Sequence, residues 1–349
     1  MAEQTAVFNI VVTNIREEVP GVKTFFVAGA DGGAMPYISG QFITLVFTHH
    51  GREERRSFSI SSCAEMGEPL AFTVKRIDNG AYSRYLVDRV AVGSTLYTTG
   101  AAGMFTLPAE MGALAQVFFF AAGIGITPVV SLIKSLLVGS DKQVVLIYSN
   151  RSQDEVVFYN VLQALVKQYP ERFQLELLYS TAFNLERARL SKSLLPVLLQ
   201  EYARVPYGDM LFYLCGPFDY MRMVVYGLEE QGISNSYIRR ENFNTNNRYT
   251  PRAEPPDKAA HVVTLTVNGS ERSFEVHYPQ TILQAAKANG ISLPYSCETG
   301  RCGSCVARCT EGKVWLSYNE VLMPADLQKG LILTCVAHPI NGDVRITVN

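Results

Sequence analysis

Three cysteines with the spacing C-x4-C-x2-C lie near the end of the chain, and a fourth follows after 29 residues. They are Cys297, Cys302, Cys305 and Cys335. Four thiolates in this pattern are typical of the ligands of a plant-type [2Fe–2S] cluster. Gly300 and Gly303 lie between them, and glycines let a tight loop turn its N–H groups toward the sulfurs. The spacing therefore predicts an iron–sulfur site that carries one electron at a time.

Two other uses of these cysteines compete with the cluster. A structural zinc site usually has two C-x2-C pairs, and only one such pair is present. Disulfides are typical of exported proteins, and the first residues, Met1-Ala2-Glu3-Gln4-Thr5, contain neither the basic nor the apolar segment of an export signal. We therefore expect the cluster, with zinc as the main alternative, in a cytoplasmic protein.

The composition is that of an ordinary globular chain. Its 349 residues are enough for two or three domains, with 48% hydrophobic and 18% charged residues. A net charge of −1 gives no reason to expect a nucleic acid or an anionic membrane as partner. The longest apolar run, residues 117–122, is too short to span a bilayer.

Residues 1–108 contain closely spaced short strand patterns separated by Gly, Pro and Asp turns. This spacing predicts a closed antiparallel β-barrel, with one helix near residues 82–90. One of its strands reads Arg55-Arg56-Ser57-Phe58-Ser59. On such a strand Arg56 could neutralise a pyrophosphate while Phe58 stacks on a flat ring system. Taken alone, the same pattern also fits a solvent-exposed barrel strand.

From residue 109 the pattern changes. The apolar run 117–122 is typical of a parallel strand buried on both faces, and it leads into Gly123-Ile124-Gly125-Ile126-Thr127-Pro128 and a helix over residues 129–138. A strand, a Gly-x-Gly turn and a helix N-terminus form an anion site, although Pro128 replaces the third glycine of the G-x-G-x-x-G dinucleotide motif. An ordinary strand-to-helix turn is the alternative.

Strands and helices then alternate up to residue 243, which predicts a doubly wound parallel sheet. One strand ends in Cys215-Gly216-Pro217. Ligands bind at the carboxyl ends of the strands in such sheets, where both this tripeptide and the Gly-x-Gly turn fall. The polar, proline-bearing residues 244–258 read as a linker. Residues 259–349 then form a small module with a hairpin turn at Asn268-Gly269, a helix over 282–289 and the cysteine loop.

These motifs together resemble a known family. Residues up to about 250 are similar to the ferredoxin–NADP reductase superfamily, and residues 261–349 are similar to a plant-type ferredoxin domain. This order resembles the reductase subunits of phenylacetyl-CoA epoxidases and related oxygenases. The flavin signature R-x-[YF]-S matches residues 56–59, V-K-R matches Val74-Lys75-Arg76, G-x-G-x-T-P matches 123–128, and C-G-P matches 215–217.

The resemblance implies three domains: an FAD-binding antiparallel β-barrel (1–108), an NAD(P)-binding α/β domain (109–243) and, after the linker, a β-grasp [2Fe–2S] ferredoxin domain (259–349). It places FAD between the barrel and the sheet. The implied cofactor-binding residues are Arg56, Phe58, Ser59, Val74, Lys75, Arg76, Gly80, Ser83, Gly123, Gly125, Thr127, Pro128, Gly216 and Pro217. Asn79 departs from the family's G-G-x-x-S segment, so only Gly80 and Ser83 are carried over from it.

The implied catalytic residues are Ser59, Thr127 and Cys215, with Cys215 close to the nicotinamide ring. A small buried residue is the commoner role of a free cysteine and remains the alternative for Cys215. Arg151 and Ser152 follow the second strand of the sheet and could hold a 2′-phosphate, which favours NADPH. Arg151 could equally be a solvated surface residue. Cys63 and Cys309 match no ligand position, and we interpret them as structural.

The implied function is electron transfer from NAD(P)H through FAD and the cluster to a protein acceptor. A flavin can take two electrons and release them singly, which joins a hydride donor to a one-electron centre. The resemblance points to an oxygenase component of aromatic catabolism as the acceptor. Residues 259–349 carry seven acidic and seven basic side chains, so no acidic docking face is expected. A stand-alone reductase of a small molecule and a non-catalytic redox carrier or sensor are the alternatives.

Overall fold

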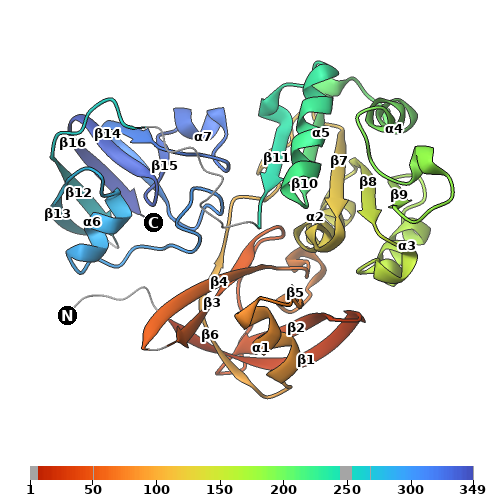
Figure 1. Cartoon of the computed structure of the whole chain (residues 1–349), viewed down its shortest axis with the longest axis horizontal. Coiled ribbons are helices and arrows are strands. Elements are labelled where there is room, and N and C mark those ends of the chain that lie inside the picture. The colour runs from red at the N-terminus through yellow and green to blue at the C-terminus, as the bar shows by residue number, and fades with distance from the viewer. Residues whose placement is uncertain (1–6, 50, 244–253, 268, 349) are drawn as a thin grey trace.

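The computed structural model describes residues 7–49, 51–243, 254–267 and 269–348 and arranges them in three units (Figure 1). An antiparallel sheet lies at the bottom of the view, a parallel sheet with helices at the upper right, and a smaller sheet at the left. Most of the predicted linker (244–253) and Asn268 of the predicted hairpin turn lie outside the described residues. No helix in the described ranges is both long and apolar enough to cross a membrane.

The first unit is a six-stranded antiparallel barrel, as the sequence predicts. Its sheet order is β4-β3-β6-β1-β2-β5, and a bridge between Ile60 and Phe72 joins the two outer strands. Alternation along the first strand buries Ile10 and Val12, because successive side chains point to opposite faces. The elements are β1 (Phe8–Val19), β2 (Val22–Gly29), β3 (Phe42–His49), β4 (Arg52–Ser59), β5 (Ala71–Lys75), α1 (Ala81–Arg89) and β6 (Thr95–Ala102).

The second unit is a parallel five-stranded sheet of order β11-β10-β7-β8-β9 with helices on both faces. Its strands are β7 (Gln116–Ala122), β8 (Gln143–Asn150), β9 (Phe173–Tyr179), β10 (Met210–Cys215) and β11 (Ile238–Glu241). Its helices are α2 (Ile126–Gly139), α3 (Tyr159–Gln168), α4 (Leu194–Tyr202) and α5 (Phe218–Glu230). Short 3-10 helices in the barrel and this unit are η1 (Ala64–Met66), η2 (Gly123–Gly125), η3 (Gln153–Glu155), η4 (Leu185–Arg187), η5 (Tyr207–Asp209) and η6 (Asn235–Tyr237).

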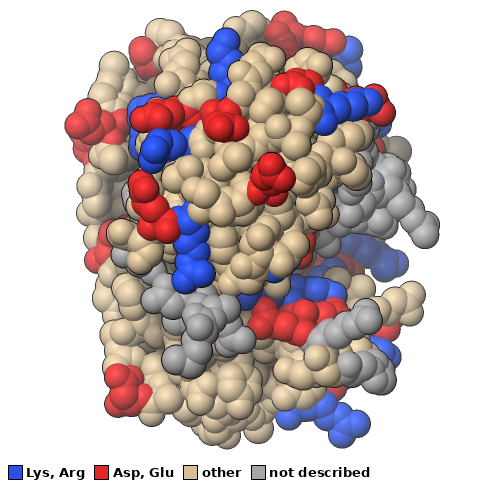
Figure 2. Space-filling view, turned by 90° about the vertical axis from the view of Figure 1, so that its left-hand side faces the viewer, with Lys and Arg blue, Asp and Glu red and all other residues tan. Residues whose placement is uncertain are grey.

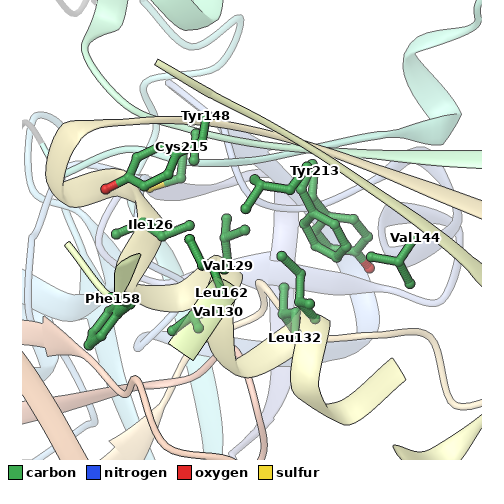
Figure 3. Packing of buried hydrophobic residues seen from close by; sticks show 14 of the residues in the cluster. Ile126, Val129, Val130, Leu132, Val144, Tyr148, Phe158, Leu162, Tyr213 and Cys215 are labelled. Atoms are coloured by element: carbon green, nitrogen blue, oxygen red, sulfur yellow. The ribbon is translucent and has the colours of Figure 1, made fainter. Parts of the chain in front are cut away.

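The continuous apolar run of β7 is explained by this two-sided cover. Phe119 packs in the core beneath α2 and α3, whereas Phe118 and Phe120 pack in the core beneath α4 and α5. All three side chains are fully buried. Figure 3 shows part of the core on the α2 side, including Val129 of α2 and Tyr213 of β10. A strand covered on both faces has no position for a polar side chain.

The third unit is a mixed sheet of order β13-β12-β16-β14-β15, in which β12 and β16 are parallel. Its elements are β12 (His261–Val267), β13 (Ser270–Val276), α6 (Ile282–Ala288), β14 (Val306–Leu316), α7 (Pro324–Gln328), β15 (Leu331–Leu333) and β16 (Ala337–Val348). Helix α6 begins with a capping box between Thr281 and Gln284 and buries Leu283 against the sheet. This is the predicted β-grasp arrangement.

Some local predictions differ from the structure. Helix α3 begins only at Tyr159, because Phe158 adopts a left-handed conformation (φ 63°) that separates this helix from η3. Gly139 is the last residue of α2, and Ser140 occupies the cap position. The long strands β14 and β16 were not predicted, since both carry interior glycines and polar runs that hide the strand pattern.

Candidate functional site

A cavity of about 500 Å³ lies between the barrel and the start of α2. Eight of the predicted cofactor residues line it: Arg56, Phe58, Ser59, Val74, Lys75, Gly80, Ser83 and Thr127. They come from β4, β5, the start of α1 and the start of α2. The barrel elements β4, β5 and α1 and the helix α2 therefore bring together predicted residues that are up to 71 positions apart, from Arg56 to Thr127.

The N-terminus of α1 opens toward this cavity. Gly80 is the N-cap residue, and a Cβ placed there would lie 2.4 Å from Ser83 Oγ. Ser83 Oγ accepts a hydrogen bond from the Ile77 N–H and donates one to the Gly80 carbonyl, both at 3.2 Å. The first N–H groups of a helix have no partners within the helix and attract anions. With the cationic Lys75 and Arg56 at the same cavity, this end of α1 fits the pyrophosphate of FAD.

Arg56 and Arg76 have different surroundings. Arg56 lies over the Tyr82 ring, 4.8 Å from its centroid, and pairs with Glu54 at 2.8 Å, so its guanidinium stays beside the cavity. Arg76 does not line the cavity. It pairs instead with Asp78 and with Asp88 of α1, both at 3.1 Å. Arg76 lies just past the end of β5, and these ion pairs hold its side chain away from the cavity, whereas Lys75 lines it.

A larger cavity of about 1080 Å³ lies at the carboxyl ends of the parallel strands. The predicted residues Gly123, Gly125, Arg151, Gly216 and Pro217 line it. The two cavities adjoin, because Lys75, Ile124 and Phe243 line both. A nicotinamide dinucleotide in the larger cavity could therefore reach a flavin in the smaller one.

The two glycine turns are packed directly against each other. A Cβ on Gly125 would lie 2.1 Å from the Cys215 carbonyl oxygen, so the approach of these turns requires glycine. Cys215 is fully buried beneath them and lines neither cavity. Figure 3 shows it among the apolar side chains of the sheet core. Burial and the nearby Glu241 carboxylate raise the pKa of its thiol well above the ordinary value.

Two other predicted residues support the turn from within. Thr127 donates a hydrogen bond through Oγ1 to the Ile124 carbonyl at 3.0 Å, which leaves its side chain fixed at the wall of the smaller cavity. Pro128 is buried in the first turn of α2 and lines neither cavity. Its position there is the one that proline favours in a helix, since the first turn needs no N–H donor.

Ser59 is bonded to an acidic residue that the sequence did not reveal. Its Oγ donates a hydrogen bond to Glu241 Oε2 at 3.1 Å, and both residues are buried. Burial raises the pKa of Glu241 to about 8, with the Ser59 hydrogen bond opposing this shift. Ser59 therefore lies between the cavity and a carboxyl group that can hold a proton near neutral pH.

Several residues at or beside the two cavities were not predicted, among them Phe243 and Arg189 in the walls and Glu241 behind Ser59. Glu241 ends β11, and the ends of parallel strands are ligand positions, so its place in the chain was a usable signal. The burial of Glu241 could not be predicted from the sequence, because it depends on how β11 packs against β10 and β4. Phe243 and Arg189 lie in segments without periodicity, where only the fold shows what they face.

The four predicted cluster ligands come together in the loop before β14 and the turn after β15. Their thiols form two hydrogen-bonded pairs, Cys297 with Cys302 and Cys305 with Cys335. The Cys302 thiol lowers the pKa of Cys297 to about 5. The Thr299 N–H donates to Cys297 Sγ at 3.4 Å.

This arrangement fits a two-iron cluster. Two pairs of thiols can supply the four thiolates that hold its two irons. Gly300 and Gly303 both have a φ of +76°, which glycine adopts without strain and which turns the loop around the thiols.

The remaining predicted structural cysteines hydrogen-bond elsewhere. Cys63 is buried and donates to Glu65 Oε2 at 3.2 Å, and burial raises the pKa of its thiol to about 11. Cys309 of β14 donates to the Glu311 carbonyl at 3.3 Å. These contacts are consistent with the structural role proposed for both residues.

Family models match the three units in order. The model described as an oxidoreductase FAD-binding domain covers residues 13–107, an oxidoreductase NAD-binding domain covers 119–226, and a 2Fe-2S iron-sulfur cluster binding domain covers 265–339. These descriptions agree with the cofactors expected from the sequence and with the sites described above.

Whole-chain relatives have the same organisation. The ferredoxin reductase component of 3-ketosteroid-9-alpha-monooxygenase from Rhodococcus rhodochrous is 32% identical over 318 residues, covering 89% of this chain and 87% of that protein. One of the subunits of 1,2-phenylacetyl-CoA epoxidase from Escherichia coli K12 is 31% identical over 312 residues, covering 88% of this chain and 87% of that subunit. The crystal structure of phthalate dioxygenase reductase superposes with a TM-score of 0.59 at 21% identity and covers 98% of each chain, which shows a shared fold.

Proposed function

The chain belongs to the family of oxygenase reductase components that join FAD-binding, NAD-binding and [2Fe–2S] domains, and we propose that it delivers electrons from NADPH to an oxygenase component. One observation carries this proposal. A nucleotide cavity adjoins a flavin cavity through Lys75, Ile124 and Phe243, and Ser57 at the flavin cavity is hydrogen-bonded to Ser296, beside the first cluster ligand. The three sites therefore follow one another in space.

The cofactors supply the electron chemistry when bound: FAD converts a two-electron hydride into single electrons, and the cluster carries single electrons. The protein binds and orients them. Lys75, Arg56 and the N-terminus of α1 hold the pyrophosphate of FAD, and Phe58 packs near its ring system. Gly216 and Pro217 receive the dinucleotide at the carboxyl end of β10. Thr127 and Ser59 present hydroxyls at the flavin cavity, with Cys215 as a packing residue beneath the nicotinamide site.

The purified protein provides the test of this function. NADPH added without oxygen is expected to bleach a flavin absorbance band and then to reduce an iron–sulfur signal visible by electron paramagnetic resonance. Transfer to the oxygenase component of the same cell should follow. Turnover of a small molecule without any second protein would instead support a stand-alone reductase, and a flavin that NADPH leaves oxidised would support a redox carrier or sensor.

The rate of flavin reduction is expected to fall as the pH rises through about 8, the pKa of Glu241. Below that pH Glu241 is protonated and can donate to Ser59 Oγ in place of the Ser59-to-Glu241 bond seen in the structure, which frees the Ser59 hydroxyl hydrogen to point into the cavity. Above it the carboxylate accepts from Ser59 and takes that donor away. Glu241→Gln keeps an uncharged donor beside Ser59, so its rate should stay flat from about pH 6 to about pH 10 in stopped-flow measurements. An alkaline fall of equal size in both proteins would contradict this role.

Arg151→Ala is expected to lower kcat/KM for NADPH by about 10- to 100-fold, because a lost charge-assisted bond to a 2′-phosphate has this effect. Arg151 and Arg189 both line the nucleotide cavity, where guanidinium groups can bind a phosphate. NADH lacks the phosphate and should be used nearly as well as before. Arg204→Ala is the matched control, since Arg204 is exposed on the same unit and its guanidinium donates to the backbone carbonyls of Glu201 and Ala203. Equal losses with both nucleotides would contradict NADPH selectivity.

An oxygenase component is the proposed partner. The relatives named above serve a ketosteroid monooxygenase and a phenylacetyl-CoA epoxidase, which supports the class of partner, and an oxygenase of aromatic catabolism stays the finer prediction. Figure 2, seen from the side of the third unit, shows acidic and basic side chains intermixed. Association is therefore expected to depend only weakly on salt. The unoxidised thiols of the site suit the cytoplasm, which we keep as the proposed location.

A further inference from the structure

The cluster loop and the flavin cavity are joined by a direct side-chain contact. Ser57 Oγ and Ser296 Oγ are 2.6 Å apart, although 239 positions separate them in the chain. Ser57 also bonds Thr44 Oγ1 of the neighbouring strand at 3.0 Å, so its hydroxyl is held from both sides. Ser57 lies between Arg56 and Phe58 in β4, and Ser296 directly precedes the ligand Cys297. The contact therefore joins a wall of the flavin cavity to the backbone of a cluster ligand.

An aromatic clamp lies next to this contact. The ring of Tyr295 has two cations on it: the Arg55 guanidinium at 4.0 Å and the Lys287 ammonium at 3.3 Å from its centroid. Arg55 Nη1 also donates to the Tyr295 carbonyl at 3.3 Å. The Arg55 side chain is only 6% exposed. Cation–π contacts are stronger when they are withdrawn from water, so this clamp is well suited to hold the two units together.

The clamp joins elements of different units. Arg55 belongs to β4 of the barrel, whereas Lys287 belongs to α6 of the third unit and also pairs with Glu298 at 2.9 Å. The Glu53 carboxylate orients Arg55 in the same way, because Arg55 Nε lies 2.7 Å from Glu53 Oε1. Both cations are thus oriented by acids on their own units before they contact Tyr295.

Contacts on the other side of the cluster loop restrain rotation about this clamp. Asn242, next to Glu241, donates to Glu320 Oε2 at 3.1 Å, and Glu320 is 3.4 Å from Nε of the buried Arg301. A Cβ on Gly303 would lie 2.8 Å from Met104 Cγ. The loop is therefore fixed by residues 295–296 at β4, by Gly303 against Met104 just after β6, and by Arg301 through Glu320 and Asn242 at the end of the parallel sheet.

We propose that Arg55 and Tyr295 are positioning residues for electron transfer inside the chain: their clamp holds the cluster loop against the flavin cavity through the Ser57–Ser296 contact. This inference rests on the proposed function. In the step it serves, one electron passes from the reduced flavin to the oxidised cluster. Two such steps pass on the two electrons of one hydride. The protein acceptor reoxidises the cluster between the two steps. The protons of the reduced flavin are released to solvent.

The test compares Arg55→Ala, Tyr295→Ala and Tyr295→Phe in the holoprotein. Stopped-flow absorbance follows flavin bleaching and cluster reduction separately after NADPH is added. Both alanine variants should reduce the flavin at the wild-type rate and the cluster at least tenfold more slowly. Tyr295→Phe keeps the ring that both cations contact and should restore the wild-type rate. Hydrogen–deuterium exchange without NADPH should rise in β4 and in residues 293–298 of the alanine variants alone.

Arg16→Ala is the matched control. Arg16 bonds Glu18 at 2.7 Å and lies 5.6 Å from the Phe26 ring centroid, so it repeats the chemistry of Arg55 within the barrel. Cluster reduction at the wild-type rate in both alanine variants would overturn the proposal. An equal decrease in the rates of flavin reduction and cluster reduction would also overturn it. Slow cluster reduction without a rise in exchange would also overturn it. Failure of the proposed function is distinct, because the wild-type flavin or cluster would then not be reduced.

Discussion

Cys302→Ser is expected to abolish electron delivery to a one-electron protein acceptor while NADPH oxidation by ferricyanide survives. Cys302 belongs to the first thiol pair, and a cluster that lacks one of its four thiolate ligands is not held at its proper potential. Reduction of cytochrome c should therefore fall by about 100-fold or more, since no other one-electron centre follows the flavin. Ferricyanide accepts electrons from the flavin directly, so its reduction should stay within about twofold of wild type.

Cys309→Ser is the matched control for this experiment. Cys309 lies close by in sequence but bonds the Glu311 carbonyl in β14, so its replacement should leave both activities unchanged. Iron analysis and absorbance spectra of each variant report whether the cluster has assembled. Loss of both activities in Cys302→Ser with flavin still bound would contradict the proposed order of electron transfer.

Ser59→Ala is expected to slow flavin reduction by NADPH about 100-fold, the typical effect of removing one well-placed hydrogen-bond donor from an active site. Ser59 Oγ lies at the cavity wall and reaches Glu241 Oε2 at 3.1 Å. Without this hydroxyl the cavity loses the hydrogen-bond donor that Glu241 orients, so hydride transfer to the flavin slows. Rapid mixing with NADPH under anaerobic conditions measures the effect directly.

Two further serine variants separate this role from packing. Ser59→Thr keeps the hydroxyl and should recover much of the lost rate. Ser61→Ala removes a buried serine two residues along, which bonds Thr73 Oγ1 at 2.8 Å within the barrel, and should leave the rate near wild type. If Ser61→Ala slowed flavin reduction as strongly as Ser59→Ala, the loss would come from barrel packing and the proposed role of Ser59 as a donor would be wrong.

The sequence predicted the cluster ligands, a buried strand and a glycine turn, because each of these depends on residues that are close together in the chain. The C-x4-C-x2-C spacing limits which metal centre a loop can hold, and the apolar run at residues 117–122 predicted a strand covered on both faces. The glycines of residues 123–125 indicated a turn that could bind an anion, with an ordinary strand-to-helix turn as the alternative. The fold class followed from these local patterns, whereas the family, FAD and the nicotinamide cofactor followed from the resemblance that the motifs carry, and all agree with the comparisons.

The tertiary structure alone decided which side chains meet across the units. Arg76 looked equivalent to Lys75 in the V-K-R motif, yet its ion pairs with Asp78 and Asp88 hold it away from the cavity. Glu241 was an unremarked acid until β11 placed it beside Ser59. The contact of Arg55 with Tyr295 spans 240 positions. Periodicity and motif spacing reflect forces between near neighbours in the chain, whereas burial and long-range contacts depend on how whole units pack.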